Sequence, residues 1–233
     1  MKTFPILEAA QANELLVRYL IWDLDGTLFD TYPAIAQAFI AALAEHGYCP
    51  ERDIVMQLAR VSLSHCFATL AARYRLSPSA VQQSFSEQYA KTPFAQQPVM
   101  PGGRELCTYI VSVGGQNVIV THRGRRSTIG LLKAHALKTL IADSITGDDG
   151  FPKKPDPSGM QAIIARNGIV PQEGLAIGDR GLDIAAGRAS GLRTCLLGEL
   201  VDQADPDYRV DHLGELLEII QQENRTGQVG TTQ

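Results

Sequence analysis

Two aspartates stand where a predicted strand ends, and together they could bind a cation. Asp23 and Asp25 follow the apolar run Tyr19–Trp22 and open the polar segment Asp-Leu-Asp-Gly-Thr. Residues two apart in an extended backbone point to the same side, so the two carboxylates would lie together. A hard divalent cation such as Mg²⁺ would relieve their repulsion. Gly26 permits an unusual turn or a close backbone approach to a ligand, although the segment alone fits a simple turn equally well.

Three further polar positions follow apolar runs in the same way. Asp179 ends the run Gly174–Ile177, and Asp183, four residues on, would face back toward it if a helix begins there. Capping a helix is the competing interpretation, more so for Asp183 than for Asp179. Thr121 ends another run, and Lys154 belongs to Lys-Lys-Pro in a later loop. Taken singly, a lysine pair is typical of solvated surface and a threonine of a helix cap.

Strands and helices that would position these residues alternate along the chain. Apolar runs predict strands at Tyr19–Trp22, Asn117–Val120, Ile141–Thr146, Gly174–Ile177 and Arg193–Leu197. Helical patterns lie between them, at Gly103–Val113, Arg125–Ala136, Pro157–Asn167 and Leu182–Ala189. This alternation predicts an α/β fold, a Rossmann-like doubly wound parallel sheet. Ligands of such sheets bind beyond the carboxyl ends of the strands, which is where the polar residues fall.

One long segment interrupts the alternation. No strand is predicted between Asp30 and Pro101, whereas Ile35, Phe39 and Leu43 keep helical spacing, as do Val61–Tyr74 and Pro78–Tyr89. We therefore expect an inserted all-helical cap domain at 33–97, within a discontinuous core of 1–32 and 98–221. Helical spacing also predicts a short helix at Ile6–Val17, and the polar residues 222–233 are expected to form a flexible tail.

In chain order the polar residues give Asp-x-Asp, Thr, Lys and Asp, and this set resembles the haloacid dehalogenase superfamily of phosphotransferases. The segment Asp23–Thr27 is similar to its first motif and Thr121 to its second. Lys154 before Pro155 is similar to the third, and Gly178-Asp179 with Asp183 to the fourth. The resemblance runs from about Tyr19 to the predicted helix near Leu213–Ile220. The helical insert resembles the cap of the phosphoglycolate phosphatase and β-phosphoglucomutase branch.

The resemblance implies a Mg²⁺-dependent phosphatase that acts on small phosphate monoesters, 2-phosphoglycolate being one candidate. Asp23 would attack phosphorus and form an aspartyl-phosphate. Asp25 would protonate the leaving alcohol and then deprotonate the attacking water. Mg²⁺ would be held by Asp23 and Asp179, with the backbone carbonyl of Asp25 as a further ligand. Thr121 and Lys154 would bind the transferring phosphoryl oxygens.

Further residues receive supporting roles from the same resemblance. Asp183 is expected to orient Lys154 or a metal-bound water rather than to bind the metal itself. Gly26, Thr27, His122, Arg123 and Arg60 are expected to contact the substrate; Arg60, between two cap helices, would touch a second anionic group. His122 and Arg123 depart from the small or amide residues that often follow the second motif in the family. A packing or surface role is the alternative for His122, Arg123 and Arg60.

The composition limits which binding partners and which cellular compartment are expected. The 233 residues carry 21 Lys+Arg and 25 Asp+Glu, a formal net charge of −4, and 45% of them are apolar. This balance indicates an ordinary globular protein without a global field for nucleic acid or anionic lipid. The four cysteines form no C-x-x-C motif, and we find neither a signal peptide nor a membrane span. We expect a cytoplasmic monomer or homodimer whose partner is a small phosphorylated metabolite.

Three other functions compete with the phosphatase. A phosphomutase would use the same residues but return the phosphoryl group to a bound sugar phosphate. Haloalkanoate dehalogenation is disfavoured, because family members that perform it need no metal and lack the second carboxylate, here Asp25. A non-catalytic binding protein on this scaffold is the remaining alternative, and the intact carboxylates argue against it, since clustered buried charges are costly without a function.

Overall fold

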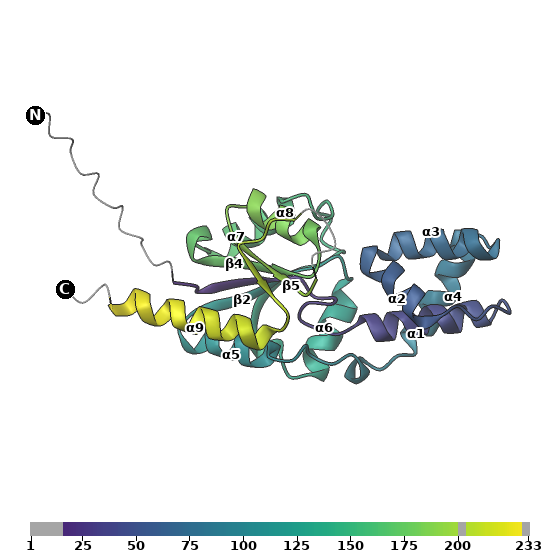
Figure 1. Ribbon diagram of the computed structural model, residues 1–233, viewed down its shortest axis with the longest axis horizontal. Helices are drawn as coiled ribbons and strands as arrows, with labels where there is room; N and C mark the ends of the chain where they lie inside the picture. Colours follow the sequence, from purple (N-terminus) through teal and green to yellow (C-terminus); the bar gives the residue numbers. More distant parts are fainter. Residues whose placement is uncertain (1–15, 200–203, 230–233) are drawn as a thin grey trace, which may run out of the picture.

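A six-stranded parallel sheet forms the centre of the molecule (Figure 1). The computed structural model describes residues 16–199 and 204–229. The strands run in the order β3-β2-β1-β4-β5-β6 and every pair is parallel. They are β1 (Tyr19–Trp22), β2 (Gln116–Val120), β3 (Ile141–Ile145), β4 (Gly174–Gly178), β5 (Arg193–Leu197) and β6 (Tyr208–Val210). Because β1 lies between β2 and β4, the three segments that follow these strands leave the sheet side by side.

Helices cover both faces of the sheet. On one face α5 (Gly103–Ser112), α6 (Arg125–Ala134) and α9 (Leu213–Val229) pack on a core that includes Leu20 and Trp22 of β1. On the other face α7 (Ser158–Asn167) and α8 (Gly181–Ala189) pack on a core that includes Ile21. The period-two alternation of a strand thus supplies both cores from one short apolar run. Single-turn 3₁₀ helices lie at Phe94–Gln96, Lys138–Leu140 and Pro171–Glu173.

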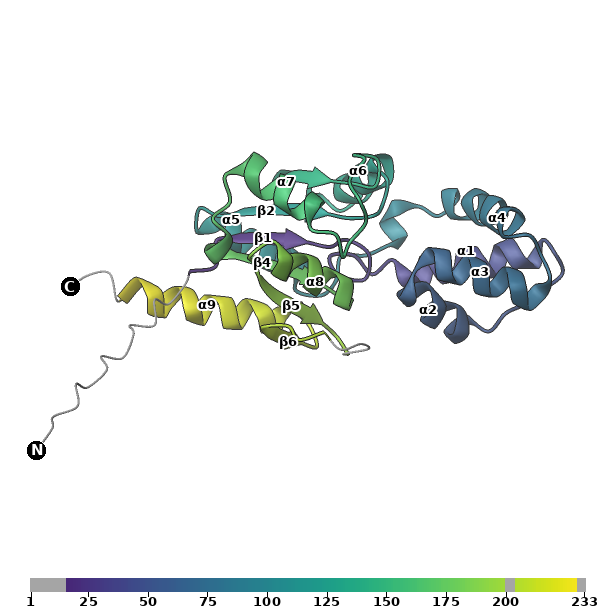
Figure 2. The same cartoon turned by 90° about the horizontal axis from the view of Figure 1, so that it is seen from above.

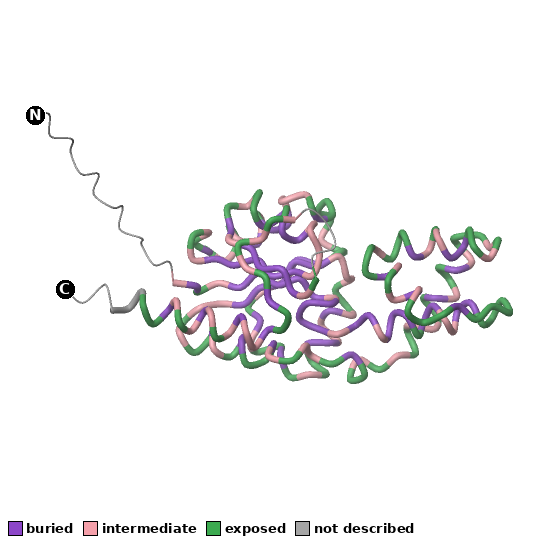
Figure 3. The backbone as a smooth tube through the Cα atoms, viewed as in Figure 1, coloured by how far each residue is buried: buried purple, intermediate pink, exposed green. Residues whose placement is uncertain are grey.

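Four helices form a separate lobe beyond one end of the sheet (Figure 2). They are α1 (Tyr32–Ala44), α2 (Arg52–Val61), α3 (Leu63–Tyr74) and α4 (Pro78–Ala90), and they leave the core directly after β1. The lobe has its own apolar core, with Phe39 at its centre in ring contact with Phe67 and Phe85. Figure 3 shows buried backbone in both lobes, with exposed segments around each.

The predicted fold class, a Rossmann-like parallel sheet with an inserted helical cap, is confirmed. Sequence patterning missed two elements. Strand β6 has three residues and a polar one, Arg209, in the middle, so no alternation could mark it. Helix α2 was missed although its sequence has helical periodicity, with the buried residues Val55 and Ala59 four positions apart. The predicted helix at Ile6–Val17 lies outside the described residues, apart from its last two positions.

The expectation of a flexible tail from residue 222 is wrong for residues 222–229, which belong to α9. Asn224 explains the difference, because its buried amide accepts a hydrogen bond from the Val17 N–H at 2.8 Å and donates one to the Val17 carbonyl at 3.0 Å. The Asn224 side chain therefore holds α9 against the segment that leads into β1. None of the described helices has the length and hydropathy needed to cross a bilayer.

Asn117 gives a test of the fold through its buried hydrogen bonds. Its Oδ1 accepts from the Trp22 indole N–H at 3.1 Å, and its Nδ2 donates to the Cys107 carbonyl at 2.9 Å and the Leu140 carbonyl at 3.1 Å. Asn117→Leu leaves these groups unpaired, so we expect the free energy of unfolding to fall by about 2–4 kcal/mol. Urea denaturation followed by Trp22 fluorescence measures it, and an unchanged midpoint would contradict the assigned role.

Candidate active site

The candidate active site lies at the carboxyl end of the sheet, where β1, β2 and β4 stop. Asp23 follows β1 directly, Thr121 follows β2 and Asp179 follows β4. Lys154 enters from the loop after β3, and Asp183 from the first turn of α8. Residues that are up to 160 positions apart in the chain are brought together because parallel strands end at one edge.

A buried lysine sits between two buried carboxylates. The Lys154 ammonium Nζ lies 2.5 Å from Asp23 Oδ1 and 2.5 Å from Asp183 Oδ1, and it donates to the Val120 carbonyl at 2.9 Å. All three side chains are at most 2% exposed. Asp183 thus contacts Lys154, which was expected to be oriented by it; whether Asp183 also binds a metal stays a prediction.

The acidic cluster fits a divalent cation. Asp23, Asp179 and Asp183 each offer a carboxylate oxygen, and these oxygens lie within 4.8 Å of one another. Asp23 Oδ2 is buried and has no hydrogen-bond partner in residues 16–199 or 204–229. A buried anionic oxygen left unpaired is costly, and hard oxygen donors are what Mg²⁺ prefers. The donor set and the unpaired oxygen thus both suit a hard cation.

Electrostatics at the cluster favour the uptake of positive charge. Burial, and then the charges of Asp23 and Asp183, raise the pKa of Asp179 to about 7. Burial likewise raises the pKa of Asp23, against the opposing effect of Lys154. Arg180 adds positive charge at the rim, with its Nε 3.6 Å from Asp179 Oδ1 and 3.9 Å from Asp183 Oδ2. Lys154 and Arg180 thus offset part of the carboxylate charge.

Tyr32 at the start of α1 contacts the acidic cluster. Its hydroxyl donates a hydrogen bond to Asp179 Oδ2 at 2.7 Å. Its ring lies against Gly26, where a Cβ atom would come within 2.3 Å of Tyr32 Cε2 and 2.5 Å of Asp179 Oδ2. Gly26 also has φ +81°, so a glycine is required both for the turn and for the space. Thr27 is fully buried and faces Asp179, with its Oγ1 3.5 Å from Oδ1.

Asp25 turns away from the acidic cluster, toward an arginine. Arg123 holds it with two nitrogens, Nη2 at 2.6 Å from Oδ1 and Nε at 3.0 and 3.1 Å from the two oxygens. Thr31 donates to the same Oδ1 at 2.7 Å. Burial opposes ionisation of Asp25, but Arg123 and Thr31 outweigh it and hold its pKa below the ordinary value.

The Arg123 guanidinium also connects the core to the cap. Nη2 donates to the Tyr89 hydroxyl of α4 at 2.6 Å, and that hydroxyl donates to Gln97 Oε1 at 2.7 Å. Gln97 is buried at the segment that returns from the cap to the core. Asp25, Arg123, Tyr89 and Gln97 therefore form one connected polar network.

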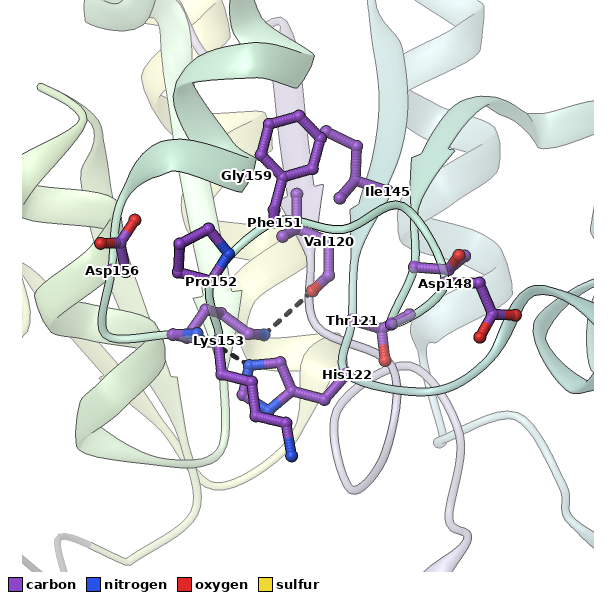
Figure 4. Close-up of a pocket in the computed structure, with 13 residues that line it drawn as sticks. Val120, Thr121, His122, Ile145, Asp148, Phe151, Pro152, Lys153, Asp156 and Gly159 are labelled. Carbon is purple, nitrogen blue, oxygen red and sulfur yellow. Dashed lines mark hydrogen bonds between the residues drawn. The ribbon is translucent and has the colours of Figure 1, made fainter.

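His122 is held in one protonation form. Its Nε2 accepts a hydrogen bond from the Lys154 backbone N–H at 2.8 Å, which leaves Nδ1 as the protonated nitrogen. Burial and the nearby Lys154 charge lower its pKa to about 4, so the ring is neutral near pH 7. Figure 4 shows His122 beside Thr121 and Lys153 in a pocket of about 310 Å³ that is lined largely by the segments after β2 and β3.

A larger cavity, of about 450 Å³, lies between the cap and the core. Asp25, His122, Arg123 and Lys154 line it from the core, and Tyr32, Ser62 and Tyr89 are among the residues that line it from the cap. Arg60 does not line it. Arg60 is exposed, lies in the last turn of α2 rather than between helices, and has its guanidinium 5.3 Å from the centre of the Tyr32 ring.

The structure thus gathers Asp23, Asp179, Asp183 and Lys154 in one cluster, with Thr121 buried at the end of the neighbouring strand. Sequence reasoning did not single out two site residues, Tyr32 and Tyr89. Tyr32 stands nine positions after Asp23 and directly before Pro33, so its place at a helix start beside the first motif was a usable signal. Tyr89 gave none, because it follows a long helical stretch.

Comparison with known proteins places this site in a family. Residues 20–197 match the family described as haloacid dehalogenase-like hydrolase. The chain belongs to this family. The suspected resemblance and the expectation of a hydrolase of this type are therefore confirmed. Among curated relatives, the phosphoglycolate phosphatase of Vibrio cholerae is 27% identical over 88% of this chain and 97% of its own length. That of Pseudomonas putida is 28% identical over 87% of this chain and 79% of its own.

Solved structures agree with the fold. A hydrolase from Streptococcus pneumoniae matches with a TM-score of 0.61 and 30% identity, over 79% of this chain and 95% of its own. A Thermotoga maritima protein provisionally named β-phosphoglucomutase matches with a TM-score of 0.75 and 19% identity, over 88% of this chain and 99% of its own. The second match, at its low identity, supports the fold alone.

The buried lysine makes a stability prediction. Lys154→Met leaves Asp23 and Asp183 buried without their cation, so we expect the free energy of unfolding of the metal-free protein to fall by about 3–5 kcal/mol. Added Mg²⁺ should restore part of that loss, because it supplies positive charge to the same carboxylates. Urea denaturation with EDTA and with Mg²⁺ measures both, and Lys153→Met is the control on the exposed neighbour. Equal stability of the two variants in EDTA would contradict the role given to Lys154.

Asp179 makes a prediction of pH dependence. Its folded-state pKa, about 7, is above its ordinary value of 3.8. The folded state therefore holds a proton that the unfolded state has released, and this group makes the metal-free protein more stable as pH falls through about 7. The side chain of Asp179→Asn does not titrate, so this variant lacks the gain in stability on acidification. In EDTA, the free energy of unfolding of Asp179→Asn minus that of wild type should therefore fall by on the order of 1–3 kcal/mol from about pH 8 to pH 5. Denaturation across pH measures this difference. A difference that grows on acidification would refute the raised pKa of Asp179.

Proposed function

We propose that this hydrolase is a Mg²⁺-dependent phosphatase that cleaves small phosphate monoesters, 2-phosphoglycolate among them, through an aspartyl-phosphate on Asp23. The observation that carries the proposal is the unpaired Asp23 Oδ2 inside the cluster with Asp179 and Lys154. The names of the curated relatives point the same way. Asp23, Asp179 and the backbone carbonyl of Asp25 would hold Mg²⁺, which supplies charge neutralisation of the phosphoryl oxygens.

The residues of this chain then divide the chemistry between them. Asp23 attacks phosphorus with the carboxylate oxygen that no side chain holds, and its other oxygen is kept in place by Lys154. Lys154 and Thr121 bind the transferring phosphoryl oxygens, and Asp183 keeps Lys154 oriented. Because a carboxylate is a weak nucleophile, positioning and charge compensation supply most of the rate.

Asp25 is the proposed acid and base. It gives a proton to the leaving alcohol in the first half-reaction and takes one from the attacking water in the second. In the structure its carboxylate is bound by Arg123 and Thr31, so it must turn toward Asp23 to act. We propose that residues 33–97 move as one cap whose closure accompanies this turn and excludes bulk water. His122, Gly26 and Thr27 shape the floor of the closed site.

The phosphomutase remains the second candidate, since the Thermotoga maritima protein shares the fold. The same residues serve both reactions, and they differ in whether water or a sugar hydroxyl reaches the aspartyl-phosphate. The carboxylate Asp25 opposes dehalogenation, and the donor set of the cluster opposes a purely binding role. We also propose a cytoplasmic enzyme, monomeric or homodimeric, that binds neither nucleic acid nor membranes.

Turnover tests the proposal. Purified protein with Mg²⁺ should release free phosphate from p-nitrophenyl phosphate and from small aliphatic esters, and EDTA should abolish the release. Asp23→Asn should lower kcat by about 10³-fold or more, because the nucleophile is lost. Its far-UV spectrum controls for folding. Isomerised sugar phosphate without free phosphate would favour the mutase, and full activity in EDTA or of Asp23→Asn would refute the proposal.

A further inference from the structure

Arg123 is a buried arginine, and the hydrogen bonds described above do not use all of its N–H donors. Its side chain is 6% exposed and lines the cavity between cap and core. Nε and Nη2 are occupied by Asp25 and by the Tyr89 hydroxyl. Nη1 donates to no acceptor in the part of the chain that the structure describes, and it is not among the side-chain atoms sealed from solvent. A guanidinium has five N–H donors, so the two on Nη1 are available to a ligand.

The other cations at the cavity are differently placed. Lys154 is enclosed by Asp23 and Asp183, and Arg180 lies beside Asp179 and Asp183. Both would face the phosphoryl group and the cation. Lys153 is exposed in the loop, and solvent therefore screens its charge. Arg123 alone among the four cations that line the cavity combines burial, free donors and contact with the proposed acid, Asp25.

The cap supplies no charge to the cavity. The residues that α1 to α4 and their connections contribute are aliphatic, aromatic or hydroxyl-bearing: Tyr32, Ile35, Ala59, Ser62, Leu63, Ser64, Phe85 and Tyr89. Arg60, which lies in the same lobe, is exposed, lies over the Tyr32 ring and is not among the residues that line the cavity. A second negative charge on the substrate would therefore find its partner on the core side of the cavity, at Arg123, and not on the cap.

We propose that Arg123 determines specificity by binding, through Nη1, a carboxylate on the leaving group of the substrate. This inference rests on the proposed phosphatase function and narrows its substrate class. Since Nη2 of the same guanidinium is 2.6 Å from Asp25, the bound carboxylate would lie close to the position from which Asp25 turns toward the ester oxygen. The substrate must then carry its carboxylate only one or two carbons from that oxygen, as 2-phosphoglycolate does.

The planar guanidinium favours a carboxylate over a neutral hydroxyl. Through Nη1 it can give a carboxylate a charge-assisted hydrogen bond between two full charges, whereas a neutral hydroxyl accepts only a weaker one. The guanidinium is also almost buried, so its interactions are screened less than those of Arg60 or Lys153. Esters with the carboxylate removed should bind in the same cavity but lose this contact.

A matched pair of esters tests the inference. 2-Phosphoglycolate and 2-hydroxyethyl phosphate differ in that the carboxylate of the first is a hydroxymethyl group in the second. We expect the wild-type kcat/KM for 2-phosphoglycolate to be about 10- to 100-fold higher, the range of a charge-assisted hydrogen bond. Arg123→Met should reduce this ratio to near one. Arg123→Lys should keep an intermediate ratio, because it retains the charge but not the planar donors.

Lys153→Met is the control, since it removes one positive charge from the same cavity and should leave the ratio unchanged. The wild-type ratio needs no variant, so the test holds even if Arg123→Met is unstable. A wild-type ratio near one, an equal loss for both esters in Arg123→Met, or a ratio that collapses in Lys153→Met would each overturn the inference. Release of phosphate from p-nitrophenyl phosphate separates these results from failure of the phosphatase proposal, in which no ester is hydrolysed.

Discussion

The ammonium of Lys154, buried between Asp23 and Asp183, is the interaction on which the rest of the site depends. Asp23 and Asp179 follow strands β1 and β4, and Asp183 lies in the first turn of α8, so the fold holds the three carboxylates close together despite their repulsion. One buried cation offsets part of that charge and leaves a deficit on the side of Asp179. This uncompensated negative charge suits a hard cation, and it includes the buried Oδ2 of Asp23, which has no hydrogen-bond partner within residues 16–199 and 204–229.

The cap and the core are coupled through the same charges. Tyr32, the first residue of α1, donates to Asp179, and Tyr89 of α4 accepts from Arg123. Each contact joins a cap helix to a carboxylate or an arginine of the core. Movement of the cap therefore changes the surroundings of Asp179 and Asp25 together. Arg123 holds Asp25 and also donates to Tyr89, so a displacement of α4 would alter the contacts that hold Asp25.

The sequence alone was sufficient for the parallel sheet and the helical insert, and it placed Asp23 near Asp179, whereas Asp25, expected beside Asp23, pairs with Arg123. Strand ends of a parallel sheet converge at one edge, so Asp23, Thr121 and Asp179 could be placed together from their positions after apolar runs. Side-chain pairing was not accessible in that way. The partner of Arg123 depends on the rotamer of Asp25, and the position of Tyr89 depends on how α4 packs on α1. The end of α9 was mispredicted because Asn224, a residue typical of loops, makes buried hydrogen bonds.

The contrast between Arg60 and Arg123 bears on where an enzyme of this architecture can discriminate between substrates. A cation on a cap helix, exposed as Arg60 is, attracts anions of many kinds, and solvent screens the attraction. Arg123, in contrast, is buried, and its guanidinium is fixed by the Asp25 carboxylate and the Tyr89 hydroxyl. Such a cation would bind an anion only at one distance from the reacting oxygen. A neutral cap wall then needs only to exclude water and fill space. Asp25 of the core and Tyr89 of the cap orient the guanidinium before a substrate arrives, so the side chain need not be ordered on binding.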